Sequence, residues 1–351
     1  MIRREDRDPP FRVGAMLACL AAANILAWIW AFAAFGDRPV LLGSALLAWV
    51  FGLRHAVDVD HIAAIDNVVR KLTRAGRHAH ATGLYFSLGH STVVALACVA
   101  IAVSAAAWDL DPWKAALGGI GSAVSAVFLL LAAAMNLAAL RGTWRAFRLA
   151  RLGEDGAARY TVGHGAAPDG AGLGGSGPLA RLMRKLPRFV SRPGHMYPLG
   201  FLFGLGFDTA TEIGLLALAA AQAVHGMPPW QVMIFPALFT AAMALVDTAD
   251  SVFMVGVFGW ASNDPVRKLW YNLTVTATSV AVAVLVGGIE ALGLLADRLN
   301  LDGGVWSLAL RLNNEQTAFG CAVIGVFAVS WAISALLYRW RSRDPALTGT
   351  E

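Results

Sequence analysis

Long apolar stretches alternate with short polar segments along the whole chain. Each stretch is close to the about 20 residues that an α-helix needs to cross the hydrocarbon core of a bilayer. The first is too long for the core of a signal peptide, and its leader is strongly charged. We therefore predict eight membrane helices, at residues 14–35, 40–67, 83–107, 115–140, 197–224, 231–258, 269–296 and 317–338.

Composition supports this class of protein. Hydrophobic residues make up 57% of the 351 residues and charged residues only 15%, and the mean hydropathy is +0.59. Soluble domains contain about 25% charged residues, so a soluble enzyme, a disordered chain and a small disulfide scaffold are excluded. The three cysteines lie in apolar stretches without metal-binding spacing, so neither a disulfide nor a zinc site is predicted.

Basic residues divide unequally between the two sets of loops. If the N-terminus is cytoplasmic, the loops on that side carry 23 Lys and Arg residues and the opposite loops carry four. The positive-inside rule then predicts that both termini are cytoplasmic. The net charge of +5 therefore reflects topology, and no nucleic-acid partner is expected. A basic, Gly-rich cytoplasmic loop at 141–195 separates two four-helix halves, 1–140 and 196–351, and its basic flanks suit anionic membrane lipid.

Ionisable side chains inside predicted membrane helices are costly and usually mark a pathway. They gather in the second, third, fifth and sixth stretches: Arg54, His55, Asp58, Asp60, His61, Asp66, His90, Asp208, Glu212, Asp247 and Asp250. Glu290 stands alone in the seventh stretch, where we expect it to reach toward the lipid interface.

The polar end of the second stretch places several metal-binding side chains on one side of an ideal helix. At about 100° per residue, Asp58 and His61 follow His55 around one side, Asp66 returns near His55, and Asp60 falls on a different face. Two imidazoles with a carboxylate are typical ligands of a first-row transition metal, whereas magnesium and calcium prefer oxygen. A proton relay, a cytoplasmic loop and structural ion pairs with Arg54 stay open as alternatives.

Four motifs give a more specific indication. The chain reads RHAVDVDHIAAIDN at 54–67, LGHSTVV at 88–94, LGFDTATEI at 205–213 and FPALFTAAMALVDTADS at 235–251. The first contains His-x4-Asp-His, and the set resembles, in order, the signature motifs of the nickel/cobalt transporter (NiCoT) family. This resemblance implies eight membrane helices, cytoplasmic termini and a long central loop.

The resemblance also implies where the substrate ion binds. It implies a metal site made by His55, Asp58, Asp60, His61 and His90. Helix geometry favours Asp58 as a ligand and the motif favours Asp60, and the sequence does not decide between them. Gly89, beside His90, would let two helices approach closely.

The remaining polar residues of the motifs extend this site into a pathway. Asp208 and Glu212 (i, i+4) share one helix face, and Asp247 and Asp250 (i, i+3) share another. In lipid, such a pair suits one of three roles: lining a cation path, coupling protons, or pairing with Arg54. The pathway residues we predict are Arg54, Asp66, Asn67, Asp208, Thr209, Glu212, Asp247 and Asp250.

The function expected from the sequence is import of divalent nickel and/or cobalt across the cell inner membrane. No phosphate-binding loop of the GxxxxGK[ST] type occurs, so no nucleotide-hydrolysing motor, ATPase subunit or cofactor is expected. An efflux permease of the same superfamily is the alternative, although the central loop has only His164 and His195 and is not His-rich. An intramembrane metalloenzyme is disfavoured because HExxH is absent, so we expect no enzyme activity.

Overall fold

The computed structural model describes residues 10–104, 123–134, 136–137, 140–141, 144, 190–206, 209–261, 265–315, 318, 321–322, 325–326 and 329. All regular secondary structure in these ranges is helical. The main helices are α1 (Pro10–Phe35), α2 (Pro39–His55), α3 (Val59–Arg74), α4 (Thr82–Ser104), α8 (Met196–Gly204), α9 (Ala210–Val224), α10 (Pro229–Val232), α11 (Ile234–Ala261), α12 (Pro265–Leu299) and α13 (Gly304–Asn314), with a 3-10 turn η3 (Pro193–His195) before α8.

Four described helices are long and apolar enough to cross a membrane, and the bent pair of α2 and α3 makes a fifth candidate. They coincide with the predicted first, second, third, sixth and seventh stretches. The predicted fourth helix is described mainly over Ala123–Ala134, which is helical and apolar. The predicted eighth helix, 317–338, lies largely outside the described residues.

Two of the predicted helices are interrupted in the structure. The second stretch ends as α2 at His55 and restarts as α3 at Val59, with a bend of 50°. The fifth stretch ends as α8 at Gly204 and restarts as α9 at Ala210. Each break leaves helix ends inside an apolar stretch, a feature found where irregular backbone lines a polar site rather than lipid.

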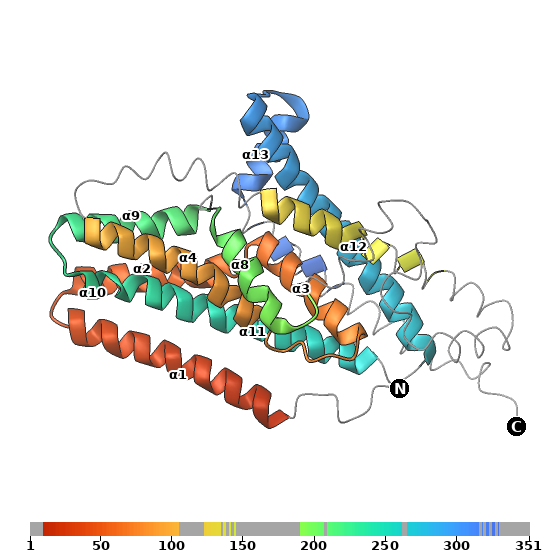
Figure 1. The fold of residues 1–351 in the computed structure, drawn as a ribbon, viewed down its shortest axis with the longest axis horizontal. Coiled ribbons are helices and arrows are strands. Elements are labelled where there is room, and N and C mark those ends of the chain that lie inside the picture. The colour runs from red at the N-terminus through yellow and green to blue at the C-terminus, as the bar shows by residue number, and fades with distance from the viewer. Residues whose placement is uncertain are drawn as a thin grey trace, which may run out of the picture.

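Helices from the two ends of the chain pack against each other throughout. In Figure 1, α1, α2, α4, α9 and α11 run along the long axis, and α11 lies among helices from the first third of the chain. Asn24 of α1 joins three of these helices. Its Nδ2 donates to the carbonyl of Ala241 (2.8 Å), and its Oδ1 accepts from Trp49 Nε1 (3.0 Å). Such hydrogen bonds stabilise helix contacts where lipid offers no hydrophobic driving force.

Glycines bring the helix backbones into direct contact. A Cβ atom on Gly52 would overlap the carbonyl of Phe239, and one on Gly83 would overlap that of Asp247. A Cβ on Gly89 would overlap the carbonyl of Tyr197. The predicted role of Gly89 in close helix approach is thereby confirmed.

We expect Gly89→Ala to destabilise the protein by pushing α4 away from α8 and moving the neighbouring His90. Overpacking of this kind costs ~1–3 kcal/mol, so the thermal unfolding temperature of detergent-purified protein should fall by several degrees. Gly43→Ala is the matched control, because nothing lies within 4 Å of a Cβ atom at that helical position. Equal unfolding temperatures for the two variants would contradict the packing argument.

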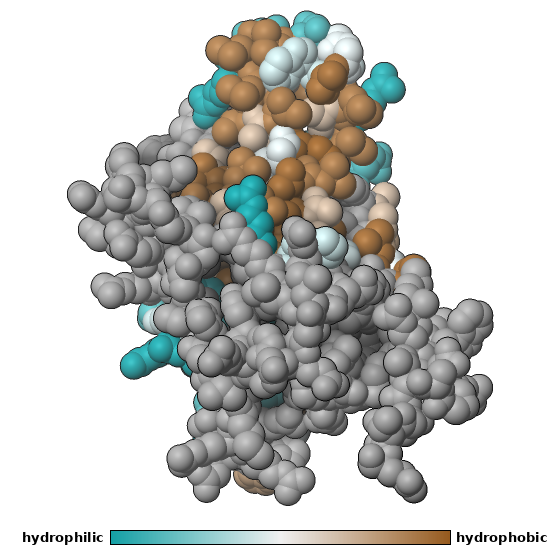
Figure 2. All heavy atoms as spheres, turned by 90° about the vertical axis from the view of Figure 1, so that its right-hand side faces the viewer, coloured by the Kyte–Doolittle hydropathy of each residue, from teal (hydrophilic) through white to brown (hydrophobic). Residues whose placement is uncertain are grey.

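Helix α13 and the adjoining end of α12 rise above the other helices in Figure 1. The predicted seventh membrane helix lies within α12, whereas α13 was not predicted. The described surface in Figure 2 is mostly hydrophobic in its upper part, as expected for a surface in contact with lipid. Exposed side chains such as Leu295, Leu299 and Leu308 belong to these two helices.

Candidate metal centre

Three buried histidines from α2, α3 and α4 converge at the break between α2 and α3. One ring nitrogen from each of His55, His61 and His90 lies within 4.8 Å of the other two. The exposed fractions of the three residues are 1%, 0% and 3%. Neutral imidazole nitrogens suit nickel, cobalt, copper and zinc, so this cluster could hold a first-row transition metal ion.

The ring of His55 is held from its Nδ1 side. This nitrogen lies 2.8 Å from Asp58 Oδ2 and 3.1 Å from Thr211 Oγ1. Asp58 begins α3 as its N-cap residue, but its side chain makes no capping hydrogen bond and turns to His55 instead. A carboxylate on one ring nitrogen fixes the tautomer and leaves the other nitrogen, Nε2, as the metal ligand.

His61 has the same arrangement with a carboxylate from a distant part of the chain. Its Nδ1 lies 3.3 Å from Asp247 Oδ2 of α11, and that oxygen also accepts a 2.6 Å hydrogen bond from Ser87 Oγ. The Nε2 atom of His61 is buried and makes no hydrogen bond to any described residue. Buried polar atoms are nearly always satisfied, so this nitrogen is available for a ligand.

His90 and Glu212 complete the centre. His90 Nε2 lies 2.8 Å from His55 Nε2 and 2.9 Å from Glu212 Oε1. Glu212 is 1% exposed, and its Oε1 lies 4.0 Å from His55 Nε2. The centre therefore combines three imidazoles with the carboxylates of Asp58, Asp247 and Glu212, so that nitrogen ligands and negative charge lie together.

The local sequence explains why α9 begins at this point. Thr209 is the N-cap of α9, and its Oγ1 accepts from the backbone N–H of Glu212 and donates to Glu212 Oε2. Thr209, Ala210, Thr211 and Glu212 have the T-x-x-E spacing of a capping box. The same residues that start the helix therefore also orient a carboxylate toward the histidines.

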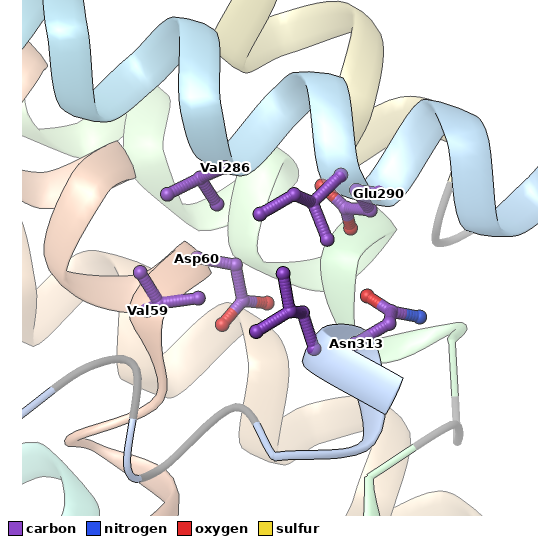
Figure 3. Close-up of a pocket in the computed structure, with 7 residues that line it drawn as sticks. Val59, Asp60, Val286, Glu290 and Asn313 are labelled. Atoms are coloured by element: carbon purple, nitrogen blue, oxygen red, sulfur yellow. The ribbon is translucent and has the colours of Figure 1, made fainter. Parts of the chain in front are cut away.

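Asp60 bonds to the backbone of the next residue. Its Oδ1 accepts from the backbone N–H of His61 (2.9 Å). Its side chain enters a small pocket between α3, α12 and α13, opposite Glu290 and near Asn313 (Figure 3). Glu290 is 7% exposed and accepts a 2.8 Å hydrogen bond from Ser125. The expectation that Glu290 reaches the lipid interface was wrong.

Asp66 and Asn67 continue along α3 beyond His61. Asp66 forms a buried ion pair with Arg70 at 2.9 Å and accepts from Ser279 Oγ of α12 at 2.7 Å. Asn67 bonds to the Ala63 carbonyl and to Asn136. Arg70, counted above among the cytoplasmic loop charges, lies inside α3 and is 1% exposed, so that placement was wrong.

The remaining predicted residues are separate from the histidines or outside the described chain. Asp250 lies one turn beyond Asp247 on α11. Arg54 is exposed at the end of α2, next to His55. Asp208 lies outside the described residues.

Three hydroxyl-bearing residues of the site were not among the predicted site residues. Ser87 holds Asp247, Thr211 contacts His55, and Ser279 holds Asp66. Thr211 belongs to the motif at 205–213 and Ser87 directly precedes the motif at 88–94, a signal that was present. Ser279 stands in an otherwise ordinary apolar helix and gave no signal.

A chain with several membrane helices around a buried histidine and carboxylate centre defines a membrane metal-transport protein. Residues 41–337 match the model of a family described as "High-affinity nickel-transport protein", and the chain belongs to this family. This is a family of permeases, so the chain is a membrane transporter and not an enzyme.

Curated relatives cover nearly the whole chain. The "Hydrogenase nickel incorporation protein HupN" of Bradyrhizobium diazoefficiens is 56% identical over 321 residues, 91% of this chain and 82% of that protein. The "High-affinity nickel transport protein" of Cupriavidus necator is 50% identical over 96% of this chain and 94% of its own length. The "Cobalt transport protein NhlF" of Rhodococcus rhodochrous is 34% identical over 96% of this chain and 93% of its own. No solved structure is significantly similar to the chain.

Proposed function

We propose that this protein imports divalent nickel, and cobalt as a second substrate, across the cytoplasmic membrane. The observation that carries the proposal is the convergence of three buried imidazoles, with the Nε2 atom of His61 lacking a hydrogen-bond partner among the described residues. The relatives named as nickel and cobalt transport proteins support the choice of ions. An imidazole-rich site favours these ions over magnesium and calcium.

In this proposal the ion loses water and binds between the three histidines. His55 and His61 bind it through Nε2, because Asp58 and Asp247 hold their Nδ1 atoms. His90 supplies the third nitrogen. These assignments make Asp58 an orienting partner of His55 rather than a direct ligand.

Carboxylates around the centre guide the ion to and from the histidines. Glu212 supplies negative charge beside His55 and His90. Asp60 attracts cations from the pocket that it shares with Glu290, and Thr209 begins α9; Asp208 is assigned to the pathway from its motif alone. On the other side of the centre, Asp66, Asn67, Asp247 and Asp250 lead along α3 and α11, with Arg54 at the end of α2.

The proposed topology has eight membrane helices with both termini in the cytoplasm. It rests on the excess of basic residues in one set of loops, 22 without the buried Arg70, against four in the other. Residues 1–140 and 196–351 then form four-helix halves joined by the loop 141–195, in the inner membrane. Import needs no cofactor and no nucleotide-hydrolysing partner, since the membrane potential favours inward movement of two charges by about 4.6 kcal/mol per 100 mV.

The direction of transport is tested with cells that lack their own nickel importers. We expect these cells, when they produce this protein, to accumulate radioactive nickel from submicromolar medium and cobalt to compete for the uptake. Collapse of the membrane potential should lower the rate, because the dication moves down that potential. Lower nickel content with greater nickel resistance would instead show efflux.

A further inference from the structure

A fully buried arginine lies on α3 beyond the metal centre. Arg70 is 1% exposed and is the largest of the fully buried side chains in the described chain. It follows His61 by nine residues, about 13 Å along an α-helix. A guanidinium is always charged and is costly inside a membrane, so it requires a partner and usually has a function.

The partner of Arg70 is a carboxylate that faces the proposed cation path. Arg70 Nη2 donates to both oxygens of Asp66, at 2.9 and 3.1 Å, and Ser279 Oγ donates to Asp66 Oδ2 at 2.7 Å. Val69 and Leu72, beside Arg70 on α3, and Val282 on α12 belong to one buried apolar cluster. Asp66 and Arg70 are each 1% exposed, so the ion pair is buried.

A second row of carboxylates links this pair to the metal centre. Asp247 contacts His61, and Asp250 follows one turn later on the same helix. Helix α11, which carries Asp250, packs against α3, which carries Asp66. The Oδ2 atom of Asp250 is buried and receives no hydrogen bond from any described residue. Asp247, Asp250 and Asp66 thus form an interrupted row of carboxylates that begins at His61. One oxygen of Asp250 in this row is free to accept a further bond from the described residues or an ion.

We propose that Asp66, supported by Ser279 and Asp250, is a second cation station on the cytoplasmic side of the histidines, and that Arg70 occupies it as a built-in cation until the transported ion arrives. This inference rests on the proposed function and topology. The arriving dication displaces the guanidinium from Asp66 because two charges attract the carboxylates more strongly than one. Arg70 is then a positioning residue that closes the path whenever the station holds no metal.

A purely structural ion pair makes a different prediction from a gate. Replacing both members of a structural buried pair by neutral residues is often harmless to stability, whereas removing one member leaves an uncompensated charge. If the pair is only structural, the double neutral variant should therefore regain the stability that each single variant loses. A cation station is lost in that variant, because its carboxylate is gone.

Metal binding to purified protein separates the two roles without relying on transport. In a His55→Ala, His61→Ala background, which removes the histidine centre, we expect no bound Ni²⁺ after equilibrium dialysis against nickel chloride. Adding Arg70→Met should expose Asp66 and give about one weakly bound Ni²⁺ per chain, since carboxylate oxygens bind hard divalent cations. Adding Asp66→Asn to that variant should abolish the new site.

Two control variants show whether the effect belongs to the guanidinium. Lys71→Met removes the same charge one residue further along α3 and should create no nickel site. Arg70→Lys keeps the charge without the planar fork and should likewise bind no extra ion. Folding of each variant is checked by gel filtration in detergent.

Uptake by cells supplies the second measurement. With the histidines intact, we expect Asp66→Asn, Arg70→Met to remain folded but to transport nickel far more slowly than the unmodified protein. Wild-type uptake by this double variant, or an unchanged nickel stoichiometry on Arg70→Met, would overturn the proposal. If the unmodified protein binds no nickel while Arg70→Met gains a site, the proposed function fails and the cation station stands.

Discussion

We expect nickel uptake to fall to the background of cells without the transporter when His55 and His61 are both replaced by alanine. The two rings supply two of the three converging ligand nitrogens, and water cannot replace both imidazoles in a site that must also strip the ion of water. Ligand loss should abolish binding to the purified protein as well. The measurements are radioactive nickel uptake at submicromolar concentration and equilibrium dialysis.

The matched control for this variant is His225→Ala, which removes an exposed imidazole after the end of α9. This variant should transport nickel at the wild-type rate. Uptake by the double histidine variant at that same rate, with equal amounts of protein in the membrane, would eliminate the proposed metal centre.

The second large effect is expected for Glu212→Gln, which keeps the shape of the side chain and removes its charge. Glu212 accepts hydrogen bonds from Thr209 and lies 2.9 Å from His90 Nε2. Loss of a carboxylate that supports a metal-binding histidine typically lowers metal affinity by about 10–100-fold. Nickel affinity and the rate of uptake should both fall by a factor in this range.

Glu290→Gln is the control, because it neutralises a buried carboxylate that faces a different pocket. This second variant should leave the affinity of the histidine centre for nickel nearly unchanged. Equal losses in the two glutamate variants would show that the total negative charge matters and not the position beside His90.

The sequence was informative about composition, membrane helices and the set of site residues. Apolar length and loop charges are local properties, so the helices at 14–35, 83–107, 231–258 and 269–296 could be predicted directly. The histidines could be selected because an imidazole in a membrane helix is unusual and costly. Their mutual distances could not, because His90 reaches His55 only through the packing of α4 against neighbouring helices.

The helix breaks explain most of what the sequence did not show. A helical wheel through the second stretch assumed a continuous helix, but the chain bends by 50° between α2 and α3. The bend turns Asp58 to His55 and leaves Asp60 in the pocket with Glu290. Arg70 was assigned to a loop because a charge count treats every Arg as solvated. The structure shows that Arg70 pairs with Asp66 inside α3 and that Ser279 of α12 bonds to Asp66.

The glycine contacts restrict how the molecule can change shape during transport. Backbone meets backbone where Gly52 faces Phe239, Gly83 faces Asp247 and Gly89 faces Tyr197. Interlocked surfaces of this kind resist sliding, because a translation of one turn would drive a side chain into the opposing carbonyl groups. Of the two simple motions, rotation about these contacts preserves them whereas sliding does not, and the helix breaks beside the histidines are where the backbone can absorb a rotation.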